Sequence, residues 1–496
     1  MTTPRRYTRQ DLARLASQAM TERGLEPDFP AAVLRELASL SAPAGEAGPA
    51  LADLRALPWC SIDNDDSRDL DQLSVSETLA AGAVRIRVAI ADVDALVAQG
   101  SAIDAHAQRN TTSVYTSARV FPMLPERLST DLSSLNPGQD RLALVTEMVI
   151  GADGQVSEPS VHRAWVHNHA KLAYDAVSAW LLGQGELPAA AAAVPGLDAQ
   201  LRTQDAAAQH LRARRHAQGS LQFETFQPRV VFDGDRAIDL RQQPQNRARQ
   251  LIEELMIATN TCTARFLASH GGASIRRVVR SPERWAGIAQ LAHQYGETLP
   301  KLPDALALEG FLARRHQADP LRFPDLSLVV IKLMGAGEYV VEQPGALPGD
   351  HLGHFGLAER DYTHSTAPNR RYPDLITLRM IKALLAGAPP PYAAPELQAL
   401  ALHCTQQEDA ARKVERRMRK SEAALFLAPL IGKAFDGLVT GVGDAGAWVR
   451  SFAPPAEGRL VGHLPALRVG QQVRVRLSAT DVERGFIDFT LLPAGA

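Results

Sequence analysis

The sequence predicts a multidomain α+β protein with a helical N-terminal module, a large mixed α/β body and a small C-terminal β-barrel. Three observations support this class. Apolar residues follow helical spacing up to residue 48, strand and helix patterns mix between 58 and 430, and short β-rich segments fill 431–496. A length of 496 residues agrees with roughly three or four domains.

The N-terminal module rests on two amphipathic segments. Residues 11–16 and 31–37 place apolar side chains at helical spacing, and Pro27 and Pro30 separate them. We therefore expect a helix-turn-helix-like module over 1–48. Residues 41–49 are rich in Ala, Gly and Pro, a composition typical of a linker, and the domain division places the linker at 49–57.

The central body of the chain contains both strand-like alternation and helical spacing. Residues 84–91 alternate and then become continuously apolar, and 142–150 form a second such segment, so both are expected to be strands. A long helical pattern covers 247–268. Residues 391–430 are again helical and include the basic stretch 412–420. One α/β unit over 58–430, larger than an average domain, is the prediction.

The C-terminal segment changes character. Its short β-rich pieces, such as 437–442 and 472–477, are separated by Gly, Pro and Asp. Several short strands within about 60 residues are typical of an OB-fold β-barrel. We expect this barrel over 431–496.

Composition narrows the class of protein. The net charge is -2, with 45% apolar and 22% charged residues, as in an ordinary globular protein. Cys60, Cys262 and Cys404 are far apart and form no CxxC pair, which argues against a zinc ribbon or a disulfide scaffold. No signal-peptide pattern and no apolar run of ~18 residues is found. A cytoplasmic location without membrane contact is expected.

Residues 61–72 hold an unusual concentration of negative charge. Five aspartates occur within nine positions: Asp63, Asp65, Asp66, Asp69 and Asp71. Like charges this close repel one another, and burying one without a partner is costly. A hard cation such as Mg²⁺ or Mn²⁺ between oxygen ligands would remove the repulsion.

The acidic stretch 61–72 has two other possible interpretations. A solvated acidic loop is the first, but apolar segments at 57–60 and 73–75 flank the stretch and favour partial burial. An EF-hand calcium loop is the second. It needs Gly at its sixth position and Glu at its twelfth, where this chain has Arg68 and Ser74, so it is excluded.

Five blocks of the sequence, in the same order, resemble those of the ribonuclease II (RNB) family. They are residues 61–71, 89–93, 121–135, 170–178 and 363–374, and the resemblance covers about 58–430. It implies a processive 3′-to-5′ exoribonuclease that uses Mg²⁺, or Mn²⁺, to hydrolyse single-stranded RNA to nucleoside 5′-monophosphates. It also implies a bacterial member that works as a monomer without a nucleotide cofactor.

The resemblance assigns the chemistry to particular residues. Asp63, Asp69 and Asp71 are similar to the metal ligands, and Asp71 and Arg370 are similar to the catalytic residues. The family motif ends in two adjacent aspartates, whereas here the second is Gln72. An amide oxygen is a neutral, weaker ligand, so either one metal binds less tightly or Asp65 or Asp66 supplies the missing charge, and occupancy of a second metal site is in question. If position 72 is a ligand, Gln72→Asp should tighten metal binding.

Further residues match positions that contact RNA in the family. Tyr115 and Phe223 resemble aromatics that stack on the terminal bases, and Tyr174 and Glu253 resemble residues that read the ribose side. The full set is Tyr115, Tyr174, Phe223, Glu253, Arg371, Glu415 and Arg416. A structural role is the alternative for Arg371, and a plain charged helix face for Glu253 and Glu415.

The flanking parts also bear on function. The C-terminal segment looks like an S1-type OB fold, with Trp448, Arg450 and Phe452 as candidate RNA contacts. Many family members carry two cold-shock barrels before the body. Only about 57 residues precede it here, which is too few for two barrels.

The sequence is also consistent with two other functions. Gln72 in place of an aspartate suggests a catalytically weakened RNA-binding regulator. A Mg²⁺ phosphatase or a DNA nuclease would also use a carboxylate cluster. The retained aspartates, Arg370 and the RNA-binding tail favour the exoribonuclease.

Overall fold

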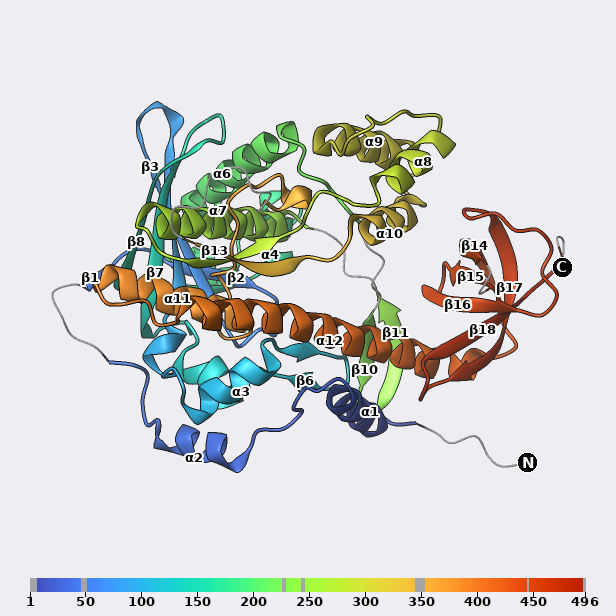
Figure 1. Cartoon of the computed structure of the whole chain (residues 1–496), viewed down its shortest axis with the longest axis horizontal. Coiled ribbons are helices and arrows are strands. Elements are labelled where there is room, and N and C mark those ends of the chain that lie inside the picture. The colour runs from blue at the N-terminus through green and yellow to red at the C-terminus, as the bar shows by residue number, and fades with distance from the viewer. Residues whose placement is uncertain are drawn as a thin grey trace.

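A computed structural model of the chain confirms the multidomain α+β class (Figure 1). It describes residues 7–45, 51–224, 229–241, 246–343, 353–443 and 446–493. A seven-stranded sheet forms the centre of the body, and a closed barrel lies at the C-terminal end.

The central sheet has the strand order β1-β8-β7-β4-β3-β2-β9. Its β1–β8 and β2–β9 pairs are parallel and the others antiparallel. The predicted strands at 84–91 and 142–150 are confirmed as β4 and β7. The strands are β1 (Ala52–Asp53), β2 (Cys60–Asp63), β3 (Gln72–Thr78), β4 (Val84–Ala91), β7 (Asp140–Ile150), β8 (Val156–His167) and β9 (Ala170–Ala173).

Long helices pack on this sheet. Helix α6 (Leu197–Ala217) contacts β3 and β4, and α7 (Arg247–Ser269) contacts β7 and β8. Helix α7 confirms the helix expected over 247–268. It buries fifteen of its residues, so it belongs to the core of the body. Helix α4 (Tyr174–Leu181) packs against α7.

Three helices form a separate lobe, α8 (Trp285–Gln294), α9 (Ala305–Ala318) and α10 (Phe323–Met334). They have an apolar cluster of their own, which includes the fully buried Phe311. In Figure 1 this lobe lies above the barrel.

Helix α11 (Tyr372–Leu385) is followed by the 34-residue α12 (Ala394–Leu427), which runs from the body to the barrel (Figure 1). The basic stretch 412–420 lies on α12 and forms ion pairs with neighbouring carboxylates, among them Lys413–Asp409 and Arg417–Glu22. No helix within the described ranges has both the length and the apolar character needed to cross a membrane.

The C-terminal segment forms a closed five-stranded barrel in the order β14-β15-β16-β18-β17, as predicted. Its apolar interior is continuous with the face of α12, because Phe489 of the barrel and Met418 of α12 belong to one cluster. The strands are β14 (Ala434–Gly443), β15 (Gly446–Ser451), β16 (Ala456–Val461), β17 (Gln472–Asp481) and β18 (Phe486–Leu491).

Smaller elements complete the chain. Three two-stranded ribbons pair β5 with β6, β10 with β11 and β12 with β13. The elements are α1 (Arg9–Glu22), α2 (Ala31–Ser39), α3 (Ala102–Asn110), β5 (Val114–Tyr115), β6 (Val120–Phe121), a π-helical turn Leu128–Leu132, α5 (Ala189–Ala192), β10 (Arg229–Asp233), β11 (Arg236–Arg241), β12 (Ser274–Val278) and β13 (Glu338–Glu342).

The N-terminal helices correct one prediction. Helix α1 packs on α12 and joins the cluster that the barrel shares, whereas α2 packs on α3 and places Val33 in the main core. The helices therefore do not form the predicted helix-turn-helix-like module, because each has an apolar stripe that a different part of the body covers. Strand β1 also lies within the expected linker 49–57 and adds an edge to the sheet.

Candidate active site

The acidic loop connects the end of β2 to the start of β3. Asp63 is the last residue of β2, and its Oδ1 accepts hydrogen bonds from the Asn64 N–H (2.7 Å) and the Ser67 hydroxyl (2.9 Å). These bonds turn the loop at its first carboxylate. Asp65 and Asp66 are exposed beyond it. The five aspartates are thus unequal, since those at 65 and 66 are exposed to solvent.

Asp71 is the buried carboxylate of the site. It is 3% exposed, and its Oδ1 accepts a hydrogen bond from the Asn369 N–H (3.0 Å). Burial raises the pKa of Asp71 to about 7, an effect that Arg370 opposes and Asp69 strengthens. Burial likewise raises the pKa of Asp69, and Asp63 adds to it. The three predicted carboxylates therefore influence one another electrostatically.

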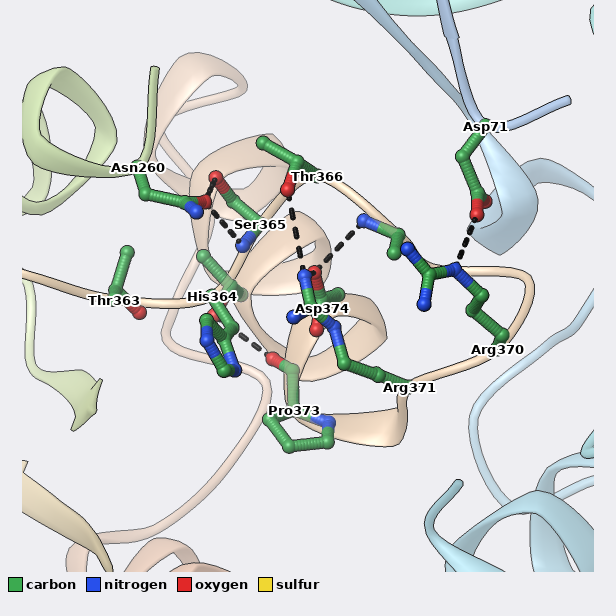
Figure 2. Close-up of polar contacts among 12 residues, drawn as sticks. Asp71, Asn260, Thr363, His364, Ser365, Thr366, Arg370, Arg371, Pro373 and Asp374 are labelled. Carbon is green, nitrogen blue, oxygen red and sulfur yellow. Dashed lines mark hydrogen bonds and ion pairs between the residues drawn. The ribbon is translucent and has the colours of Figure 1, made fainter. Parts of the chain in front are cut away.

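Arg370 meets this cluster from a distant part of the chain. It lies in the loop before α11, and its Nε is 3.5 Å from Asp71 Oδ2 (Figure 2). The Arg370 side chain is 47% exposed, whereas that of Asp71 is 4% exposed. A guanidinium with one side on a carboxylate and the other toward solvent can still bind a phosphate.

Arg371 has a different environment. Its Nη2 donates to Asp374 Oδ1 (2.8 Å), and the same oxygen accepts from the Ala367 N–H (2.8 Å). Asp374 is fully buried. Figure 2 shows this pair turned toward the start of α11, whereas Arg370 points to Asp71. These bonds support the structural role that was the alternative for Arg371, and its contact with RNA stays a prediction.

Tyr115 and Glu415 come together at the site. Glu415 Oε1 accepts a hydrogen bond from the Tyr115 N–H (3.0 Å), so α12 holds the short strand β5. Burial raises the pKa of Tyr115 to about 12, and Asp69 and Asp71 contribute. The ring therefore lies close to the carboxylates. Arg416 is exposed on α12.

Tyr174 begins α4 on the other side of the acidic loop. Burial raises its pKa and Asp63 adds to this, while Arg249 and Arg370 oppose it. The Arg249 guanidinium lies over the Tyr174 ring, 4.5 Å from its centroid, and donates to Asn64 Oδ1 (2.8 Å). Sequence reasoning missed Arg249, because a single arginine in a helix carries no signal of its contacts across the chain.

Two other predicted RNA contacts lie on different elements. Glu253 is exposed on α7. Its pKa is raised, mainly by partial burial of the carboxylate and secondly by the neighbouring Glu254. Phe223 packs against the α8–α10 lobe, near the bond from the Glu224 N–H to Ser327 Oγ (3.3 Å). The structure thus assigns Phe223 to this lobe and Tyr115 to β5, and their joint role in RNA stacking stays a prediction.

Gln72 is the first residue of β3 and pairs with Ile90 of β4. Strand alternation gives it the same face as Ser74 and Ser76, whose hydroxyls bond to Gln204 and Gln200 of α6. Asp71 has the opposite parity. A role for Gln72 as a weak metal ligand stays a prediction.

The carboxylates of the acidic loop supply part of what a Mg²⁺ site requires. Across the described ranges, no three His, Cys, Asp or Glu side chains converge on one point as a protein cage would require. Mg²⁺ is usually held by one or two carboxylates together with waters and substrate phosphates. Asp69 helps to raise the pKa of Asp71, and Asp63 helps to raise that of Asp69, so the three carboxylates lie near enough to one another to form such a partial cage.

The barrel residues correct another expectation. Arg450 is buried, and its Nη2 lies 2.8 Å from Asp325 Oδ2 of α10. It therefore joins the barrel to the α8–α10 lobe, and its prediction as an RNA contact is wrong. Trp448 is half-buried across from Gly441 of β14, and Phe452 is also half-buried. Their predicted RNA contacts stay predictions.

Comparison with known proteins agrees with this arrangement. The RNB domain family matches residues 51–387, and the RNase II-type exonuclease C-terminal S1 domain matches 433–492. Ribonuclease R of Escherichia coli is 31% identical over 94% of this chain and 60% of that protein. Exoribonuclease 2 of Cronobacter sakazakii is 33% identical over 68% of this chain and 51% of that protein. The chain thus spans about half to three fifths of the length of these relatives.

Solved structures agree in fold. The apo form of Mycoplasma genitalium RNase R superposes with a TM-score of 0.87 at 23% identity, over 97% of this chain and 78% of that one. Yeast Ssd1, described as a pseudonuclease, has a TM-score of 0.67 at 16% identity, over 84% of this chain and 52% of that one. The RNB match includes both the acidic loop and the Arg370 loop, and it covers more than half of the sequence. The chain therefore belongs to the RNB family.

Proposed function

We propose that the protein is a processive 3′-to-5′ exoribonuclease that hydrolyses single-stranded RNA to nucleoside 5′-monophosphates with Mg²⁺. The observation that carries this proposal is the contact of Arg370 with the buried Asp71, beside Asp69. Carboxylates that can hold a cation, next to a guanidinium that can hold a phosphate, are the two groups that phosphodiester hydrolysis needs.

Each side chain has a role in the proposed reaction. Arg370 binds the scissile phosphate and stabilises the charge that develops on it, because its guanidinium is half exposed while it rests on Asp71. Asp63, Asp69 and Asp71 hold the metal. When bound, Mg²⁺ or Mn²⁺ would activate water and neutralise phosphate charge. Tyr115, half-buried and electrostatically coupled to these carboxylates, stacks on the terminal base.

The preference for RNA is assigned to the Tyr174 side of the site. Tyr174 lies next to Asp63 and beneath Arg249, so its position is fixed relative to the acidic loop. We propose that it contacts the ribose, where a 2′-hydroxyl distinguishes RNA from DNA. The relatives named ribonuclease R and exoribonuclease 2 support an RNA substrate. The three cysteines are buried thiols, which suits a monomer in the reducing cytoplasm.

One assay separates this function from its rivals. The full chain is incubated with single-stranded RNA labelled at its internal phosphates, or with DNA of the same sequence labelled in the same way, in Mg²⁺, Mn²⁺ or EDTA. Wild type is compared with Asp71→Asn. Release of nucleoside 5′-monophosphates from RNA by wild type alone is the expected result. RNA binding without turnover in either metal would indicate the regulator, and equal digestion of DNA would indicate a general nuclease.

A further inference from the structure

A short buried segment, Ser133, Ser134 and Leu135, lies between the acidic loop and the Arg370 loop. It follows the π-helical turn Leu128–Leu132. The exposed fractions of the three residues are 5%, 0% and 1%. None of them carries charge, and although they belong to the block 121–135 that resembles the family, no role has been assigned to them above. Their hydrogen bonds nevertheless connect both loops.

Ser134 and Leu135 hold the acidic loop. The Ser134 hydroxyl accepts from the Leu70 N–H (3.0 Å), and its proton has two acceptors, the Arg68 carbonyl oxygen (2.8 Å) and Asn136 Oδ1 (3.0 Å). The Leu135 N–H donates to the Leu70 carbonyl (3.0 Å). These bonds fix the backbone on both sides of Asp69 and directly before Asp71. The spacing of the two carboxylates therefore depends on them.

Ser133 reaches the other loop. Its hydroxyl lies 2.6 Å from Asn369 Oδ1 and 2.8 Å from the Leu128 carbonyl oxygen of its own turn, so these two acceptors share its one proton, and Asn369 is 1% exposed. The Asn369 N–H in turn donates to Asp71 Oδ1 (3.0 Å), and the next residue is Arg370. A single hydroxyl thus links this segment to the backbone that carries the arginine.

Buried serines most often just satisfy nearby backbone groups, and that explanation needs nothing more than local bonds. Ser129 is such a case, since its hydroxyl bonds only the Pro125 carbonyl of its own turn (3.4 Å). Ser133 and Ser134 differ, because adjacent hydroxyls bond to two loops that are far apart in the chain and both carry reacting groups. Groups that orient metal ligands are often as critical as the ligands themselves.

We propose that Ser133 and Ser134 are positioning residues of the active site. Ser134 sets the spacing of the Asp69 and Asp71 carboxylates, and Ser133 sets the place of Arg370 relative to Asp71. The part that concerns turnover rests on the proposed exoribonuclease function, whereas the part that concerns metal binding does not.

The test compares Ser134→Ala and Ser133→Ala with Ser129→Ala as the matched control. Mn²⁺ binding is measured by titration calorimetry, and kcat and KM are measured on single-stranded RNA over a range of Mg²⁺. Ser134→Ala should weaken Mn²⁺ binding by about 10-fold or more, and excess Mg²⁺ should restore its turnover. Ser133→Ala should bind Mn²⁺ within about twofold of wild type, but with a kcat reduced about 10-fold at unchanged KM. Ser129→Ala should change neither.

Equal behaviour of all three variants would overturn the proposal, since it would leave only a packing role. Ser134→Thr keeps the hydroxyl and serves if Ser134→Ala does not fold. If Ser134→Thr binds Mn²⁺ with an affinity near that of wild type, the proposal is supported. If its Mn²⁺ affinity falls about 10-fold or more, the proposal is overturned. If wild type shows no exoribonuclease activity while Ser134→Ala still loses Mn²⁺ affinity, the proposed function fails and the assignment of Ser134 stands.

Discussion

Arg370 Nε lies 3.5 Å from Asp71 Oδ2, so the loop before α11 places a cation on the one deeply buried carboxylate of the acidic loop. Asp71 is shielded from solvent while Arg370 is half exposed. A substrate phosphate can therefore approach the arginine without displacing the aspartate. Substitutions at the two positions should consequently have different effects.

Asp71→Asn should abolish most of the activity while leaving RNA binding intact. The amide cannot carry the charge that holds a cation or orients water, and loss of such a group costs about 100-fold or more. Initial rates of monophosphate release and the Kd for single-stranded RNA are the measurements. Asp65→Asn is the control, because Asp65 is exposed and Lys171 contacts only its carbonyl. Comparable rates for the two variants would contradict the role of Asp71.

The same residue should make metal-free stability depend on pH. Burial raises the pKa of Asp71 from 3.8 to about 7, so the folded state favours the protonated carboxyl. The contribution is complete below about pH 4 and is lost as pH rises to about 7, by about 4 kcal/mol at most. In EDTA, Asp71→Asn should therefore have a larger free energy of unfolding than wild type at pH 8, with a smaller gain at pH 5. Denaturant titration measures this, and a gain independent of pH would refute it.

Arg370→Ala and Arg371→Ala should separate catalysis from stability. Arg370→Ala should lower kcat about 100- to 1000-fold with little change in the free energy of unfolding, because a charge-stabilising donor is lost from a half-exposed position. Arg371→Ala should cost about 3 kcal/mol of stability, because it leaves the buried Asp374 without its cation. Steady-state kinetics and denaturant unfolding of both variants provide the comparison. The reverse pattern would exchange their roles.

Arg249→Ala should weaken RNA binding more than turnover. The guanidinium holds the Tyr174 ring and the Asn64 side chain, and such a cation–π contact contributes about 0.5–2 kcal/mol. KM should rise about threefold or more at nearly constant kcat, and discrimination against DNA should fall. Arg247→Ala is the matched control, since Arg247 in the same turn of α7 pairs with Asp205 instead. Identical KM values for the two variants would exclude the role of Arg249.

The ion pair between Asp325 and Arg450 should couple the barrel to the α8–α10 lobe. Asp325→Asn and Arg450→Met each leave a partly buried charge unpaired, so each should lower stability. The double variant should lose less than the sum, with a coupling energy of about 0.5–3 kcal/mol. Thermal or denaturant unfolding of the four proteins measures it. The exposed Arg474–Asp436 pair of the barrel should give a coupling near zero.

The sequence predicted those elements of the fold whose periodicity is visible among neighbouring residues. Alternation over 84–91 and helical spacing over 247–268 became β4 and α7, and short β-rich pieces became the barrel. The pattern did not reveal that α1 and α2 pack on different parts of the body. An apolar stripe indicates that a helix is covered, but it does not identify the covering element.

The candidate site, too, was predictable from the sequence only in part. The sequence by itself determined which residue types the site contains, because carboxylates at 63, 69 and 71 and the arginine at 370 carry their chemistry wherever they lie. Only the tertiary structure decided that Asp71 is the buried carboxylate, that Arg249 covers Tyr174, that Arg450 pairs with Asp325, and that two serines connect the catalytic loops. The physical reason is that burial and hydrogen-bond partners depend on segments distant in the chain. Spacing along the sequence records only what neighbouring residues do.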